Sequence, residues 1–181
     1  MNSKVRRREL YEFIKRNREV QVADLAKLMN VSCMTIRRDL AAMEAVKLLD
    51  GVSSIFIDGS TPCYALSTLL PPERNLRVLT CNLNAAMFLR GMRNIEVILP
   101  GGTLAEDQNT INTKSAQLIP DDVFVEMAFV SCGGFSESGV VDSNLSGAYI
   151  RNYFRKTAQS VVLIADHTKY KKRGLYAVWS W

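Results

Sequence analysis

The sequence predicts an α/β protein, in which a small all-α N-terminal domain is followed by a mainly parallel α/β domain. Two observations predict this fold. Apolar residues follow helical spacing alone up to about residue 46, and beyond it short apolar strands alternate with helical segments. The net charge of +5 also lies at one end, because residues 1–47 carry eleven Lys or Arg and six acids, whereas residues 48–181 carry twelve of each. We therefore expect domains at 1–46 and 47–181.

Residues 5–16 are expected to form the first helix. Leu10, Phe13 and Ile14 lie on one face at helical spacing, so this face needs an apolar partner. The basic residues of the segment, Arg6–Arg8 and Lys15–Arg16, are expected to face solvent.

Residues 20–40 predict two further short helices joined by a tight polar turn. Between residues 22 and 29 the apolar side chains recur at i, i+3, i+4 and i+7, which places them on one face. The turn at Asn30 ends this helix. Ser32 is expected to begin the next one, because its hydroxyl can accept a hydrogen bond from the free N–H groups of the first turn.

In the helix after Ser32, the apolar residues Ile36, Leu40 and Met43 form the inward stripe. Two short helices of this kind, the second with an outward polar and cationic surface, are typical of a helix-turn-helix that reads double-stranded DNA. An alternative is that the basic side chains are only the solvent-exposed faces of a small helical bundle. The candidate DNA-binding residues are Ser32, Cys33, Met34, Thr35, Arg37 and Arg38.

The uneven charge favours the same function. A basic segment attached to a neutral one is typical of proteins that bind the phosphate backbone, which supplies affinity without sequence information. Bases would be read by the helix that follows Ser32.

Five short apolar runs predict the strands of the second domain. Most of them end in a cluster of Gly, Ser, Thr, Asn or Asp before the next element, and this alternation favours a parallel sheet with helices on its faces. Ligands of such sheets bind beyond the carboxyl ends of the strands. The runs are 54–58, 76–80, 95–99, 127–131 and 160–165.

The segment Asp58–Pro62 is the strand end most suggestive of chemistry. Gly59 permits a tight turn, Ser60 and Thr61 offer hydroxyls, and Pro62 suits the first turn of a helix whose free N–H groups face the loop. It is a candidate phosphate cradle. A purely geometric strand-to-helix turn explains the same residues, as it does for the glycine pairs at 101–102 and 133–134.

The run Val31–Leu40 resembles the signature of the DeoR family of bacterial transcription regulators, a motif close to Val-Ser-x-x-Thr-Ile-Arg-Arg-Asp-Leu. This resemblance implies that Ser32, Thr35, Arg37 and Arg38 lie at or near the operator. Cys33 and Met34 stand where the family usually has polar or acidic residues, so they are candidates for altered base preference.

The resemblance continues through the second domain, which in this family senses sugar phosphates and is related to the ribose-phosphate isomerase fold. The segments 57–61, 79–84, 99–104, 128–134, 142–144 and 163–170 are similar to the family's landmarks in order. Lys169 would supply a point charge to a phosphate, although a solvated lysine in the basic run 169–173 is an equal alternative. The effector contacts implied are Asp58, Gly59, Ser60, Thr61, Thr80, Gly101, Gly102 and Lys169.

Two departures from the family pattern are expected to matter. The family follows its Arg-Arg-Asp-Leu motif with a basic wing and a linker, which are missing here because residues 46–51 already resemble the helix before the first sensor strand. The chain also stops after residue 181, where the family continues with a strand and a helix. A truncated remnant, or a module that oligomerises without specific DNA binding, is therefore an alternative function.

Other function classes have less support. A sugar-phosphate isomerase-like enzyme needs a positioned acid and base, and no spacing singles out such a pair, so we expect no catalytic residues. The four scattered cysteines and the single His167 predict no metal site, disulfide framework or cofactor. No apolar run is long enough to span a membrane, and no signal peptide is present. We expect a cytoplasmic regulator, homo-oligomeric because operators carry paired half-sites, that binds DNA and a phosphorylated sugar.

Overall fold

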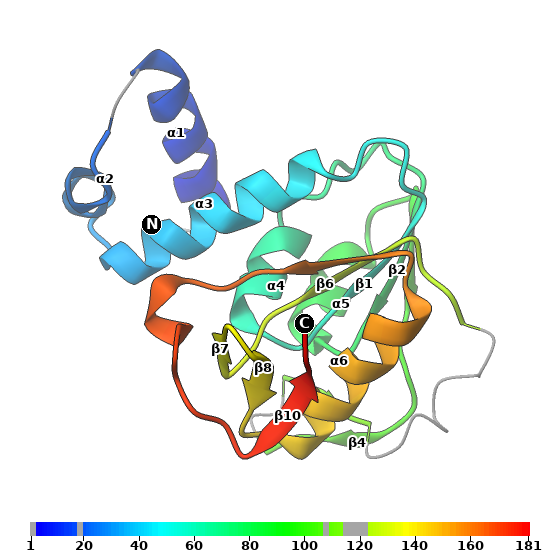
Figure 1. The fold of residues 1–181 in the computed structure, drawn as a ribbon. Coiled ribbons are helices and arrows are strands. Elements are labelled where there is room, and N and C mark those ends of the chain that lie inside the picture. The colour runs from blue at the N-terminus through cyan, green and yellow to red at the C-terminus, as the bar shows by residue number, and fades with distance from the viewer. Residues whose placement is uncertain (1–2, 18–19, 107–108, 114–122) are drawn as a thin grey trace.

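The N-terminal part of the chain consists of three helices. The structure, a computed structural model, describes residues 3–17, 20–106, 109–113 and 123–181. The three helices are α1 (Ser3–Arg16), α2 (Val22–Met29) and α3 (Cys33–Lys47) (Figure 1). They share a small apolar core that includes Leu10, Leu25 and Ile36. The expected start of the third helix is confirmed, because the Ser32 hydroxyl accepts a hydrogen bond from the Thr35 N–H at 3.1 Å.

The arginines at the start of α1 correct one expectation. Arg6 and Arg7 do not face solvent but are buried, with 8% and 4% of their surface exposed. Their Nε atoms donate to the two carboxylate oxygens of Asp39, at 2.7 and 2.6 Å. A carboxylate on α3 attracts both guanidinium groups inward because buried charges need paired partners. Of the three consecutive arginines, only Arg8 is exposed.

The expected parallel sheet is confirmed and has five strands. Their order across the sheet is β3 (Ile95–Ile98), β2 (Leu76–Thr80), β1 (Ser54–Ile57), β6 (Met127–Val130) and β9 (Ser160–Leu163). Every neighbouring pair in this sheet is parallel. The strands are rich in Val, Ile, Leu and Phe because both faces of the sheet are covered.

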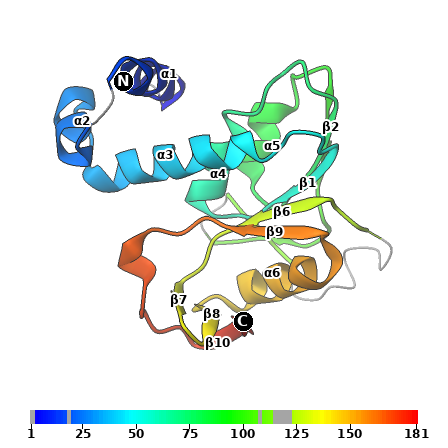
Figure 2. The same ribbon diagram turned by 45° about the horizontal axis from the view of Figure 1, so that its top comes forward.

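Helices cover the two faces of this sheet. Figure 2 shows α6 (Leu145–Thr157) on one side and α3, α4 (Thr61–Ser67) and α5 (Leu83–Leu89) on the other. On the α6 side, the rings of Phe56 and Phe154 stack with their centroids 3.9 Å apart.

Smaller elements complete the α/β part. Two short strands, β4 (Thr103–Leu104) and β5 (Ile111–Asn112), form a hairpin. A second, antiparallel sheet has the order β10, β8 and β7. The bounds of its strands and of the 3₁₀ helix η2 are Gly134–Ser136 (β7), Gly139–Asp142 (β8), Tyr176–Trp179 (β10) and His167–Lys169 (η2).

Helix α3 also belongs to the core of the α/β part. Ala42, Ala45 and Leu49 are buried in the same cluster as Ile55 of β1 and Leu66 of α4. Only residues 48–53 separate α3 from β1, which leaves no room for the wing and linker that the family pattern contains. Among the described residues, no helix has the length and apolar character needed to cross a bilayer.

Candidate functional site

A cavity of about 560 Å³ lies beyond the carboxyl ends of the central strands. Its walls come from the loop after β1, the residue after β2, the β4–β5 hairpin, the end of β8 and the first turns of α6. The lining is Gly59, Ser60, Cys81, Ala105, Glu106, Thr110, Ile111, Asn112, Asp142, Asn144, Ser146, Gly147, Ile150 and Arg151. Position and lining both fit the expectation that ligands of a parallel sheet bind at this edge.

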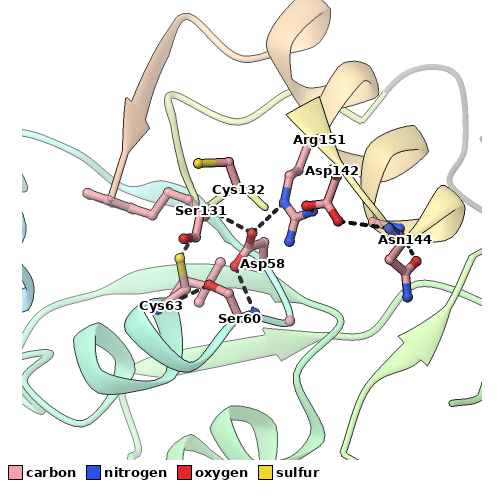
Figure 3. Close-up of polar contacts among 12 residues, drawn as sticks. Asp58, Ser60, Cys63, Ser131, Cys132, Asp142, Asn144 and Arg151 are labelled. Atoms are coloured by element: carbon pink, nitrogen blue, oxygen red, sulfur yellow. Dashed lines mark hydrogen bonds and ion pairs between the residues drawn. The ribbon is translucent and has the colours of Figure 1, made fainter. Parts of the chain in front are cut away.

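Asp58, the residue that follows β1, is buried behind this cavity (Figure 3). One carboxylate oxygen accepts the Ser60 N–H at 2.9 Å, and the other accepts the Ser131 N–H and Arg151 Nε, each at 2.8 Å. Burial alone would raise the pKa of Asp58. The Arg151 guanidinium and the hydrogen bonds outweigh burial and hold this pKa below its ordinary value. Asp58 is therefore an ionised anchor for the loop.

Arg151 joins two carboxylates that come from the ends of different strands. Besides its contact with Asp58, its NH1 atom donates to Asp142, at the end of β8, at 2.5 Å. Burial works against the charged form of Arg151, but the two carboxylates raise its pKa above the ordinary value. Two acids and one base leave this cluster with a net negative charge.

The start of α6 forms one wall. Asn144 caps the helix, since its side-chain oxygen accepts the Gly147 N–H at 2.9 Å. Asp142 holds the cap in place by accepting the Asn144 N–H at 2.9 Å. This part of the lining therefore offers carboxylate, amide and hydroxyl groups, including the Ser146 side chain, to a polar ligand.

Of the eight effector contacts expected from sequence, Gly59 and Ser60 line the cavity. Asp58 and Thr80 lie behind it as supports. Thr80 is fully buried, where its hydroxyl donates to the Ile57 carbonyl at 2.7 Å and accepts the Asn82 N–H at 3.0 Å. The hydrogen bonds of these two residues hold the backbone of the loops after β1 and β2.

The other four expected contacts, Thr61, Gly101, Gly102 and Lys169, are not among the residues that line this cavity. Thr61 and the two glycines are exposed. Lys169 Nζ instead donates to the Ser131 hydroxyl at 3.1 Å and to the Cys132 carbonyl at 2.5 Å.

Sequence reasoning missed most of the lining from α6 and the hairpin. Arg151 is separated from Asp58 by 93 positions, so no local pattern relates the two. The available signal was Asn144, because Asn is one of the residues favoured at the N-cap of a helix.

The expected DNA-binding residues all lie at the N-terminal end of α3. Ser32 is exposed, and Met34, Thr35, Arg37 and Arg38 are half-buried. Cys33 packs against the core of the three helices. It thus presents less of its side chain outward than expected.

The two thiols nearest Asp58, Cys63 and Cys81, show little capacity for chemistry. Burial first, and the nearby Asp58 charge second, raise the pKa of Cys81 to about 12 and that of Cys63 well above its ordinary value. A thiol with such a pKa is not a nucleophile near neutral pH. Among the described residues, no group of three or more His, Cys, Asp or Glu is placed to hold a metal ion.

A capped helix-turn-helix joined to a parallel sheet with a polar cavity defines the class of two-part DNA-binding regulators that carry a ligand-sensing domain. Two family models match this chain: "DeoR-like helix-turn-helix domain" over residues 6–51, and "DeoR C terminal sensor domain" over residues 34–181. The chain belongs to the DeoR family of transcription regulators.

Several curated relatives are similar over most of this chain. The transcriptional regulator GolR of Listeria innocua is 24% identical over 91% of this chain and 81% of its own length. YulB of Bacillus subtilis is 30% identical over 76% of this chain, and the glycerol-3-phosphate regulon repressor of Haemophilus influenzae is 26% identical over 78%. This chain spans just over half the length of these last two, 54% and 55%.

The alignment with GolR runs over 206 residues, more than the 181 of this chain. GolR therefore carries residues that have no counterpart here, which agrees with the short connection between α3 and β1.

Solved structures of ribose-5-phosphate isomerase share the fold. The enzyme from Neisseria gonorrhoeae matches with a TM-score of 0.51 and 12% identity, over 76% of this chain and 55% of the isomerase. A complex of another such isomerase with phospho-erythronic acid matches with a TM-score of 0.52 and 12% identity, over 74% and 53%. The expected ribose-phosphate-isomerase-like architecture is thus confirmed.

Proposed function

We propose that this protein regulates, most simply represses, a carbohydrate-utilisation operon, and that a phosphorylated sugar in the cavity beside Ser60 sets its affinity for operator DNA. Residues 1–46 would read the DNA and residues 47–181 would sense the effector. The polar cavity at the sheet edge is the observation that carries the proposal. The names of relatives, a glycerol-3-phosphate regulon repressor and an L-fucose operon activator, support this class of operon.

The chemistry of the cavity suits a sugar. Sugar hydroxyls both donate and accept, and the lining offers carboxylate oxygens from Asp142 together with the amides of Asn112 and Asn144. The phosphate needs hydrogen-bond donors, and the Ser60 hydroxyl supplies one from the loop after β1, since its oxygen accepts the Cys63 N–H and its proton can be donated. A polyol phosphate would be held at both ends in this arrangement.

Helix α4 offers a route from effector to DNA. It begins at Ser60, whose hydroxyl accepts the Cys63 N–H at 3.4 Å, and it packs along α3. At its other end, Thr68 contacts Arg7 of α1, which also pairs with Asp39 of α3. If the protein has two conformations that differ in the position of α4, a ligand that binds one of them more tightly favours that conformation. Operator affinity then shifts by at most the difference in binding free energy between the two conformations.

A regulator fits the site better than an isomerase does. Two acids of the site are already engaged, because both oxygens of Asp58 and both of Asp142 accept hydrogen bonds, whereas a catalytic base must be free to take a proton from the substrate. The lowered pKa of Asp58 makes it a weaker base still. We propose a non-enzymatic, cytoplasmic regulator that binds paired half-sites as a homo-oligomer.

Titration calorimetry with a panel of sugar phosphates and the matching free sugars tests the effector site. We expect one sugar phosphate to bind well and its free sugar poorly. Ser60→Ala should weaken binding about two- to tenfold because it removes one hydrogen-bonding group from the cavity wall. Thr61→Ala, on the neighbouring exposed residue, is the control. Equal loss in both variants, or no binding by any sugar phosphate, would contradict the proposed site.

A further inference from the structure

A basic segment of the α/β part lies beside the DNA-reading helix. We define the basic loop as residues 166–173, which begin with η2. A small cavity of about 170 Å³ is lined by Arg37 and Arg38 of α3 on one side and by Asp166, His167 and Lys169 on the other. Figures 1 and 2 show η2 on the same side of the molecule as the N-terminal end of α3.

The part of the basic loop that adjoins α3 is residues 166–169, and residues 171–173 add further cations a few positions along the chain. Between residues 166 and 173 there are four Lys or Arg and one acid. Lys171 pairs with Glu137 at 3.5 Å. Lys172 and Arg173 are exposed, and neither belongs to an ion pair within the described part of the chain. Two cations are thus available to an outside anion.

The basic loop is held in one conformation by its own contacts. Asp166 accepts the Thr168 N–H at 2.8 Å, and Lys169 Nζ is anchored on Ser131 and Cys132. The Lys171 N–H donates to the Phe135 carbonyl at 2.7 Å. Because the loop is already ordered, binding a partner costs it little conformational entropy.

The backbone of Lys172 packs against the second sheet. A Cβ at Gly134 would come within 2.0 Å of the Lys172 carbonyl oxygen, so β7 and the loop backbone lie in close contact. Lys172 and Arg173 therefore project from a fixed backbone.

We propose that the basic loop binds phosphates of the DNA backbone next to the groove entered by the N-terminal end of α3. Phosphate contacts position a reading helix without carrying sequence information, and lysine and arginine are the residues that make them. The inference rests on the proposed DNA-binding function. It extends the DNA interface from the helix-turn-helix to the α/β part of the chain, through Lys172 and Arg173.

Fluorescence anisotropy of the full chain on operator and scrambled duplexes, across a salt series, tests this inference. The variant Lys172→Ala/Arg173→Ala should bind both duplexes roughly tenfold or more weakly near 0.1 M salt, and the slope of log affinity against log salt should fall by about two. The control Arg155→Ala/Lys156→Ala removes the same charges from the exposed end of α6. It should bind as the unaltered chain does, and thermal melts check that both variants are folded.

The outcomes separate the two proposals. If the unaltered chain prefers its operator and the loop variant keeps the same affinity and salt slope, the basic loop does not contact DNA and only this inference fails. Tighter binding by the loop variant also overturns it, because the loop would then shield α3. Failure of the unaltered chain to bind either duplex overturns both proposals.

Discussion

Arg7 of α1 donates a hydrogen bond to the Thr68 hydroxyl at the end of α4. The same guanidinium pairs with Asp39 of α3, whose carboxylate lies 2.6 Å from Arg7 Nε. One buried side chain therefore joins α1, α3 and α4, the helix that begins at the proposed effector cavity. This contact connects the two proposed sites through buried side chains.

Replacing Thr68 by Val should weaken this link while it preserves the shape of the side chain. We expect the free energy of unfolding to fall by about 1–3 kcal/mol, since a charged donor loses a buried acceptor. We also expect the unliganded protein to bind operator normally but to respond less to the sugar phosphate. Urea unfolding and anisotropy with and without effector measure the two effects.

Thr61→Val, at the exposed start of the same helix, is the matched control for Thr68→Val. It should change the free energy of unfolding by less than about 0.5 kcal/mol. A full effector response in Thr68→Val would show that α4 does not couple the sites through Arg7.

Asp39→Asn should be among the most damaging changes in the three-helix part. The carboxylate is 1% exposed, and both Arg6 and Arg7 depend on it. Removing one partner of a buried ion pair costs about 3–5 kcal/mol because uncompensated charge remains. Glu44→Gln on the same helix breaks only an exposed pair with Lys47 and should cost less than about 1 kcal/mol. Similar urea midpoints for the two variants would contradict this account.

Asp58 should make the protein sensitive to acid. Its pKa is lower in the folded protein than the ordinary value of 3.8, so its stabilising effect is present above that value and is lost as the pH falls through the folded pKa. Urea midpoints between pH 7 and pH 3 should therefore drop below about pH 4. The difference between the unaltered chain and Asp58→Asn should shrink over the same range, whereas a constant difference would contradict the lowered pKa.

Thiol reactivity gives an independent test of the cavity. Cys81 is buried against the loop after β1 and has its pKa raised to about 12, whereas Cys33 is half-buried at the start of α3. A thiol reagent at pH 8 should label Cys33 first and leave Cys81 unmodified until the protein unfolds. Mass spectrometry of labelled peptides identifies the site, and rapid labelling of Cys81 in the native protein would show that the cavity wall opens.

Local patterns were enough to predict much of the fold. The Ser32 cap, the helix before it and the five parallel strands each depend on residues close together in sequence, so spacing and capping chemistry identify them. The burial of Arg6 and Arg7 could not be predicted in this way, because their partner Asp39 is more than 30 positions away.

The candidate site was predictable only in part for the same reason. The Asp58–Ser60 loop is contiguous and carries its own turn chemistry. Arg151 is an arginine within a helix, and arginine side chains are usually exposed to solvent. Its role follows only from the topology that brings α6 over the end of β1, close to Asp58 and Asp142.

The most direct test of the central claim is anisotropy of the purified chain on duplex DNA from upstream of its own and neighbouring genes, with a scrambled duplex as control, across a salt series. We predict tighter binding to one natural duplex, with that preference altered by a sugar phosphate. Equal, strongly salt-dependent binding to natural and scrambled duplexes would contradict the account, because only phosphate-backbone attraction would remain.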